Sequence, residues 1–140
     1  MILTYGESDK GLVRKVNEDA INLSVENLYL LADGMGGYDG GQIASTLAVK
    51  SAGRFLKDTP VLTEQLLKES FYCANRAILN EKVDQPELKS MGTTMVAAAA
   101  CEGKLLWAHV GDSRLYRFQD GRLEQVTVDH SFVMELVTEG

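Results

Sequence analysis

The chain has 140 residues, of which 45% are hydrophobic, and a formal net charge of −6. This length and composition support one hydrophobic core, and the chain is too short for two ordinary domains. The acidic balance argues against a nucleic-acid partner, because such a partner usually requires a basic face. No apolar run approaches the roughly 20 residues that cross a bilayer and the N-terminus has no signal-peptide pattern, so we expect a cytoplasmic protein without a membrane partner.

The first predicted elements form a β-hairpin. Ile21, Leu23 and Val25 alternate with polar residues, a short turn follows, and the continuously apolar run 28–32 predicts a second strand that ends at Asp33. The next run, GMGGYDGG, contains too many glycines for a regular element and predicts a loop.

Two helices are predicted after this loop. From residue 42 the apolar residues recur at helical spacing until Pro60 stops the pattern. The predicted buried stripe consists of Ile43, Leu47, Ala48, Ser51, Ala52, Phe55 and Leu56. A second helix is predicted over 63–82, with a buried face of Leu66, Leu67, Phe71, Ala74, Ile78 and Ala77.

The rest of the chain predicts strands, apart from an exposed connection over 83–89. Two hairpins are expected, one with strands 93–101 and 104–110 and one with strands 114–118 and 123–128. A last helix is predicted to begin near Ser131. Strands, then helices, then strands indicate an α+β fold in which helices cover antiparallel sheets.

A first cluster of chemically active residue types is RKVNED at 14–19, where Arg14 precedes the adjacent carboxylates Glu18 and Asp19. Neighbouring side chains of an extended segment point to opposite faces, so one metal ligand and one helper is the expected arrangement unless the backbone bends. The same hexapeptide could also be an ordinary surface stretch.

A second cluster is Asp33-Gly34 at the end of the predicted buried strand. A carboxylate there is costly to desolvate unless a cation, hydrogen bonds or water compensate it, and a sharp turn at Gly34 would offer its carbonyl as a further oxygen ligand for Mg²⁺ or Mn²⁺. A tight strand-to-helix turn is the alternative. Asp112, next to Gly111 and Ser113, is either a turn residue or another carboxylate of the same cluster.

Taken in order, the motifs RKVNED, DGMGG, MGTTM, HVGDSR and the pair DH at 129–130 resemble the consecutive motifs of the type 2C metal-dependent protein phosphatases. The resemblance covers the chain from Tyr5 to Gly140. It implies an antiparallel β-sandwich flanked by α-helices, and hydrolysis of phosphoserine and phosphothreonine in proteins with two Mn²⁺ or Mg²⁺ ions.

The resemblance also implies roles for individual residues. Asp19 and Asp33 would be catalytic metal ligands, with Asp33 bridging the ions and Gly34 adding its carbonyl, while Asp112 would bind a third metal. Glu18 would hold a metal-bound water and Arg14 would grip the substrate phosphate. Animal members carry a histidine as proton donor where this chain has Met35, so another group must supply that proton.

Family domains continue well beyond Gly140, and we therefore expect residues 1–140 to form a single partial phosphatase domain whose sandwich is incomplete at the C-terminus. Such a fragment should bind divalent metal weakly and have little activity. The alternative is a naturally short, catalytically inactive phosphatase-like binding or regulatory module, which binds phosphorylated partners or metal without turnover. Unpaired strands make self-association an expectation in either case.

Overall fold

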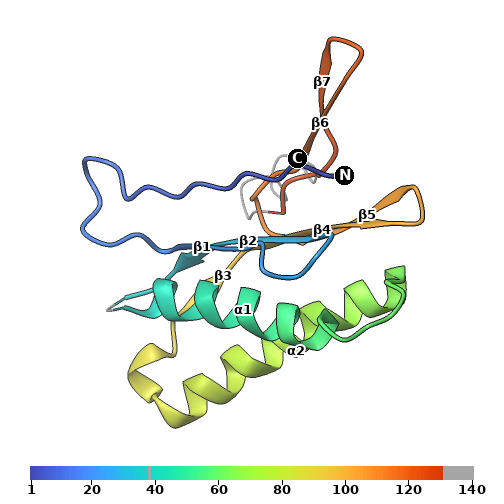
Figure 1. Ribbon diagram of the computed structural model, residues 1–140. Coiled ribbons are helices and arrows are strands. Elements are labelled where there is room, and N and C mark those ends of the chain that lie inside the picture. The colour runs from blue at the N-terminus through green and yellow to red at the C-terminus, as the bar shows by residue number, and fades with distance from the viewer. Residues whose placement is uncertain (38, 131–140) are drawn as a thin grey trace, which may run out of the picture.

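The computed structural model describes residues 1–37 and 39–130 (Figure 1). The helix predicted from Ser131 lies outside these residues. In chain order the elements are β1 Asp19–Asn22, β2 Leu28–Met35, α1 Gly40–Leu56, α2 Glu64–Asp84, the short 3₁₀ helix η1 Pro86–Leu88, β3 Gly92–Thr93, β4 Met95–Cys101, β5 Lys104–Val110, β6 Tyr116–Gln119 and β7 Arg122–Gln125. None of the described helices is long and apolar enough to span a membrane.

The main sheet is antiparallel throughout and has the order β1-β2-β4-β5, with β3 pairing the end of β2. A separate two-stranded sheet, β6-β7, stands away from it (Figure 1). The predicted α+β class with antiparallel sheets and flanking helices is confirmed. Strand β2 continues to Met35, so the prediction that it ends at Asp33 was too short.

Helices α1 and α2 cover one face of the main sheet (Figure 1). Alternate residues of β2 point toward them, and Leu28, Leu30 and Ala32 are at most 1% exposed. On β4, Ala97 and Ala99 are fully buried opposite the helices. Their small side chains allow the helical layer to approach the sheet closely.

The buried face of α1 differs from the predicted stripe. Phe55 is 39% exposed, whereas Ser45 and Gly53 are buried. A side chain at Gly53 would place its Cβ 2.6 Å from Nδ2 of Asn22, which donates a hydrogen bond to the Val49 carbonyl. Ala48, Ala52 and Leu56 of the predicted stripe are buried, so the prediction was wrong at Phe55 and incomplete at the small residues of the face on which α1 meets β1 and β2.

Helix α2 begins where the sequence predicted, because the Thr63 side chain caps it by accepting the Leu66 N–H at 3.1 Å. Its buried residues include Leu67 and Ile78 from the predicted face. The connection after it is not fully exposed, since η1 buries Leu88 in the core.

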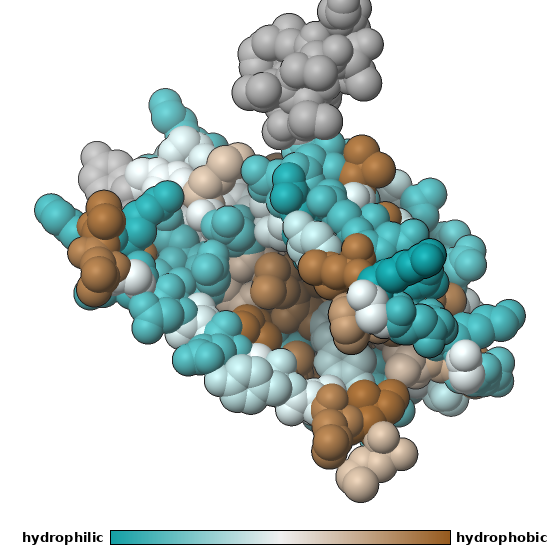
Figure 2. All heavy atoms as spheres, turned by 90° about the horizontal axis from the view of Figure 1, so that it is seen from above, coloured by the Kyte–Doolittle hydropathy of each residue, from teal (hydrophilic) through white to brown (hydrophobic). Residues whose placement is uncertain are grey.

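The opposite face of the main sheet carries an apolar hollow. Tyr29 and Leu31 of β2 line it together with Val96 and Ala98 of β4. Figure 2 views the molecule from this side and shows apolar side chains gathered in the hollow. The N-terminal segment runs over this face on its way to β1 (Figure 1).

Candidate metal and phosphate site

The candidate site is a polar hollow of about 180 Å³ at the end of the β1-β2 hairpin, beside the irregular segment that precedes β1. Antiparallel pairing places Asp19 directly opposite Asp33. The hollow is lined by Asp9, Lys10, Arg14, Val16, Asn17, Glu18, Asp19 and Asp33. The structure thus brings both sequence clusters to one place, and Glu18 and Asp19 both line it.

The segment before β1 folds back through short-range hydrogen bonds. Asp9 Oδ1 accepts the Gly11 N–H at 2.6 Å, and Gly11 has a φ of 75°, which favours glycine. Asn17 donates to the Ser8 hydroxyl at 2.7 Å and accepts the Asp19 N–H at 3.0 Å. This bent backbone allows Arg14 to face the same hollow as Asp19.

The backbone of Asp33 is fixed by hydrogen bonds, and the ionised form of its side chain is unfavourable. Its N–H donates to the Thr94 hydroxyl at 3.0 Å and its carbonyl accepts the Thr94 N–H at 2.9 Å. Burial raises the pKa of Asp33, and the nearby carboxylates of Asp19 and Asp112 raise it further, while Arg14 acts in the opposite direction. A bound divalent cation would relieve this repulsion.

Gly34 has a different physical role from the one predicted. It lies within β2 and has no positive φ, so it makes no sharp turn. A Cβ at Gly34 would lie 1.8 Å from the carbonyl oxygen of Gly41, and the Gly34 N–H donates to the Glu18 carbonyl at 3.0 Å. Glycine is required here because the strand passes directly against the first turn of α1.

The Glu18 carboxylate packs where β2 meets the first turn of α1. Its Oε1 would be only 2.3 Å from a Cβ at Gly41, so it lies against the first turn of α1. Arg14 approaches it at 3.7 Å, and the Arg14 side chain is 77% exposed. Glu18 is therefore held in place, whereas the guanidinium of Arg14 remains accessible to a ligand.

Asp112 does not line the hollow, although it is near enough to act on Asp33 electrostatically. Within residues 1–37 and 39–130, no three His, Cys, Asp or Glu side chains are grouped so that they could hold a metal ion. Gly34, a predicted carbonyl ligand, does not line the hollow either. The available donors, the Asp19 and Asp33 carboxylates, are oxygens of the kind that Mg²⁺ and Mn²⁺ prefer. They fit part of a site for such an ion.

Sequence reasoning missed three polar residues of the hollow, Asp9, Lys10 and Asn17. Lys10 adds a second cation beside Arg14. The signal for it was the Asp9–Gly11 spacing, which is typical of a side-chain-capped turn and would have placed Lys10 at a bend.

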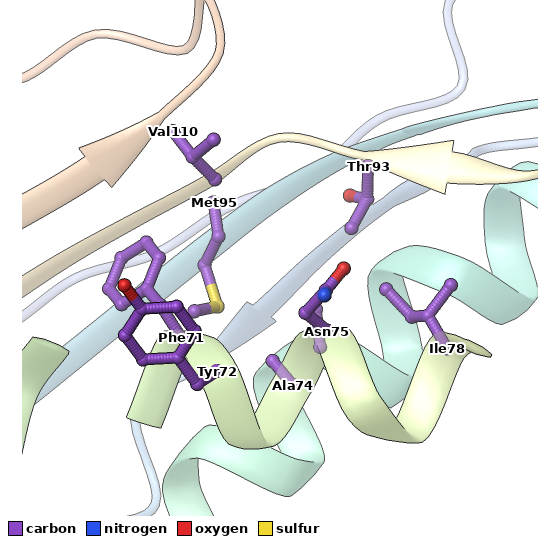
Figure 3. Close-up of a pocket in the computed structure, with 9 residues that line it drawn as sticks. Phe71, Tyr72, Ala74, Asn75, Ile78, Thr93, Met95 and Val110 are labelled. Carbon is purple, nitrogen blue, oxygen red and sulfur yellow. The ribbon is translucent and has the colours of Figure 1, made fainter. Parts of the chain in front are cut away.

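A larger hollow of about 270 Å³ lies between α2 and the edge of the sheet (Figure 3). Phe71, Ile78 and Met95 make it mainly apolar, and Asn75 and Thr93 point into it from opposite sides (Figure 3). No carboxylate or basic side chain lines it. Its chemistry does not suit a metal or a phosphate group.

Comparison with known proteins connects this geometry to a family. The family model described as "Protein phosphatase 2C" matches residues 13–138. The serine/threonine protein phosphatase PstP of Mycobacterium tuberculosis is 39% identical over 144 residues, which span all of this chain and 27% of PstP. The serine/threonine phosphatase stp of Listeria monocytogenes is 36% identical over 142 residues, spanning 95% of this chain and 56% of stp.

Solved structures give the same result. The M. tuberculosis phosphatase PstP/Ppp superimposes with a TM-score of 0.86 at 39% identity, covering 95% of this chain and 57% of that one. The PstP catalytic domain in complex with two manganese ions gives 0.87 at 39% identity, with 95% and 58% covered. Stp1 of Staphylococcus aureus gives 0.85 at 33% identity, with 95% and 56% covered. The chain thus spans between about a quarter and little more than half of these relatives.

Proposed function

Because this chain belongs to the protein phosphatase 2C family, we propose that it supplies part of the active site of an enzyme that hydrolyses phosphoserine and phosphothreonine in proteins. The observation that carries the proposal is the single hollow lined by Arg14, Glu18, Asp19 and Asp33. A hollow with both acidic and basic groups suits a cation and a phosphate side by side. The substrate class is taken from the names of the relatives.

The metal centre of this proposal uses Mn²⁺ or Mg²⁺. Asp19, Asp33 and the Gly34 carbonyl would hold the two principal ions and Asp112 would take part in binding a third. Burial and the neighbouring carboxylates raise the pKa of Asp33, which supports this assignment, as does the manganese pair in the PstP complex. Bound divalent cations supply positive charge that lowers the pKa of water and neutralises phosphoryl oxygens.

The side chains around the metal ligands have separate tasks. Arg14 binds the phosphate through its planar fork of donors, and Lys10 adds a second positive charge on the same side. Glu18, fixed against α1, orients a water by accepting its hydrogen bond. Met35 is 66% exposed and has no proton to give, so a solvent water protonates the leaving alcohol.

We propose that residues 1–140 alone bind metal weakly and turn over slowly. Two carboxylates and one carbonyl, shared between two octahedral ions, leave most of the coordination positions to water. The absence of a third grouped ligand within the described residues supports this view.

Manganese binding is the direct test. Titration of the 140-residue chain with MnCl₂, followed by the electron paramagnetic resonance signal of free Mn²⁺, should reveal a weak site that Asp33→Asn abolishes. Asp120→Asn is the matched control, because it removes a carboxylate from the tip of the β6-β7 hairpin at a positive φ that Asn tolerates. Equal binding by both variants would contradict the assignment.

Phosphate recognition needs its own measurement. Hydrolysis of a phosphothreonine peptide in Mn²⁺ should be slow but detectable, and Arg14→Lys should raise KM more than it lowers kcat, because the bidentate contact binds substrate and transition state alike. A rate as high as that of complete family members would refute the proposal of weak activity. Unchanged KM would remove Arg14 from the phosphate site.

We also propose a cytoplasmic location and self-association through strand edges. In the described part of the chain, β1 and β5 lie at the edges of the main sheet with no further strand beside them. Light scattering across a concentration series tests the second proposal, and a monomer mass throughout would refute it.

A further inference from the structure

Thr94 makes an unusual pair with Asp33. The registers on either side, Gly34 opposite Thr93 and Leu31 opposite Val96, place Thr94 directly opposite Asp33. In a regular antiparallel pair the carbonyl would accept the Asp33 N–H. Here the Thr94 hydroxyl accepts it at 3.0 Å, and the Thr94 carbonyl instead accepts the Thr93 hydroxyl at 2.8 Å.

The same hydroxyl reaches a second loop. Thr94 Oγ1 and Ser113 Oγ share a hydrogen bond of 2.6 Å across 19 positions of sequence. Ser113 is adjacent to Asp112, one of the carboxylates that raise the pKa of Asp33. Two successive hydrogen bonds therefore join the backbone of Asp33 to the loop that carries Asp112.

That loop is fixed from its other side. The Gly111 carbonyl accepts the His130 N–H at 3.0 Å. Arg114 donates two hydrogen bonds to the Asp129 carboxylate, at 2.9 and 2.7 Å. Ser113 lies between the anchored residues Gly111 and Arg114, so its hydroxyl is held in place as a hydrogen-bond partner for Thr94.

The methyl group of Thr94 is also in close contact with this loop. Gly111 has a φ of 96°, and a Cβ there would lie 2.7 Å from Thr94 Cγ2. The loop backbone thus packs directly on the side chain whose hydroxyl holds Asp33. Both van der Waals packing and a hydrogen bond from this loop therefore hold the Thr94 side chain.

We propose that the Thr94–Ser113 hydroxyl pair is a positioning device that fixes Asp33 relative to the Asp112 loop. Thr94 touches neither ion nor substrate in this view. It acts by holding the backbone of a ligand, as outer-shell residues of metal sites do. The metal-binding part of the inference rests on the proposed function, whereas the backbone part does not.

Variants of Thr94, with a control at a second threonine, separate this role from general stabilisation. Thr94→Val keeps the shape and loses the hydroxyl, and Thr94→Ser keeps the hydroxyl. Thr127→Val is the matched control, because the Thr127 hydroxyl also accepts a backbone N–H, that of Leu115 at 3.1 Å, but Thr127 has no hydrogen bond to Asp33 or Ser113. Amide hydrogen exchange of Asp33 by NMR and Mn²⁺ affinity are measured on each.

Thr94→Val should speed exchange of the Asp33 amide about tenfold and weaken Mn²⁺ binding about tenfold. Thr94→Ser should restore both, and Thr127→Val should change neither. Ser113→Ala should weaken Mn²⁺ binding in the wild-type background but have little further effect beside Thr94→Val.

Unchanged Asp33 exchange in Thr94→Val, or equal effects of Thr127→Val, would overturn the inference. If the wild-type chain binds no Mn²⁺, the proposed function fails, and the exchange measurement still decides whether Thr94 holds Asp33.

Discussion

Replacing Gly34 with alanine tests the contact on which the site is built. The new Cβ would lie 1.8 Å from the Gly41 carbonyl oxygen, 2.4 Å from the Gly41 carbonyl carbon and 2.9 Å from the Glu18 carbonyl oxygen. Ordinary carbon contacts need about 3.5 Å, so β2 and the first turn of α1 must separate by roughly 1.5 Å. All three atoms belong to the backbone, and no side-chain rotation relieves the overlap.

The expected cost is therefore at the upper end for overpacking, about 3 kcal/mol of unfolding free energy. For a chain of this size that corresponds to a Tm lower by roughly 10 °C. Urea unfolding followed by circular dichroism measures the first quantity, and a thermal melt the second. Mn²⁺ affinity should fall as well, because the Gly34 N–H bond to Glu18 is disturbed by the same displacement.

Gly37→Ala, just after the end of β2, provides the control. A Cβ at Gly37 would meet no atom within 4 Å, so its cost should stay within about 0.5 kcal/mol. If Gly34→Ala were as stable as Gly37→Ala, the close approach of β2 to α1 would be wrong. The placement of Glu18 beside that contact would then be wrong too.

Three further predictions use other parts of the structure. Leu30→Ala should cost about 3 kcal/mol in urea unfolding and Leu31→Ala under about 1, because Leu30 is 1% exposed against the helices and Leu31 is 40% exposed on the other face. Asp33→Asn should leave the metal-free Tm unchanged or raised, because the raised pKa of Asp33 means that its ionised form opposes folding at pH 7. It should also abolish the stabilisation by Mn²⁺, which in the wild type is about 2.7 kcal/mol of unfolding free energy when the Mn²⁺ concentration is a hundred times Kd. The hydrogen bond from Arg114 lowers the pKa of Asp129, so the stability that Asp129 adds should be present at neutral pH and vanish as the pH falls below about 4, which a melt of Asp129→Asn against wild type across pH would detect.

Hairpins and helix starts were predictable because their causes are local. Glu102 and Gly103 have φ values of 51° and 75°, as a two-residue turn between antiparallel strands requires. Thr63 caps α2 through a hydrogen bond to a residue three positions away. Such features depend on neighbours in sequence, so the sequence alone contains their explanation.

The features that sequence reasoning missed depend on contacts between distant segments. Gly34 was predicted to be a turn residue, but a glycine is required there because a side chain would collide with the backbone of Gly41 in α1. Lys10 joined the hollow through a bend that only the folded segment reveals. Asp19 and Asp33 were both predicted as candidate site residues. Asp33 stood out because its charge follows directly on an apolar run.

The same distinction underlies the proposal that the uncharged residues Thr94 and Ser113 position the ligands of this site. A carboxylate pair arises from the β1-β2 register alone, since pairing places Asp19 opposite Asp33. That register cannot by itself set how far Asp33 lies from the Asp112 loop, because this loop follows β5, on the far side of β4. Besides the pairing of the strands themselves, the side-chain path through Thr94 and Ser113 connects them by hydrogen bonds. Removing the hydroxyl of Thr94 or Ser113 should therefore weaken metal binding, whereas neutralising the distant carboxylate of Asp120 should leave it unchanged.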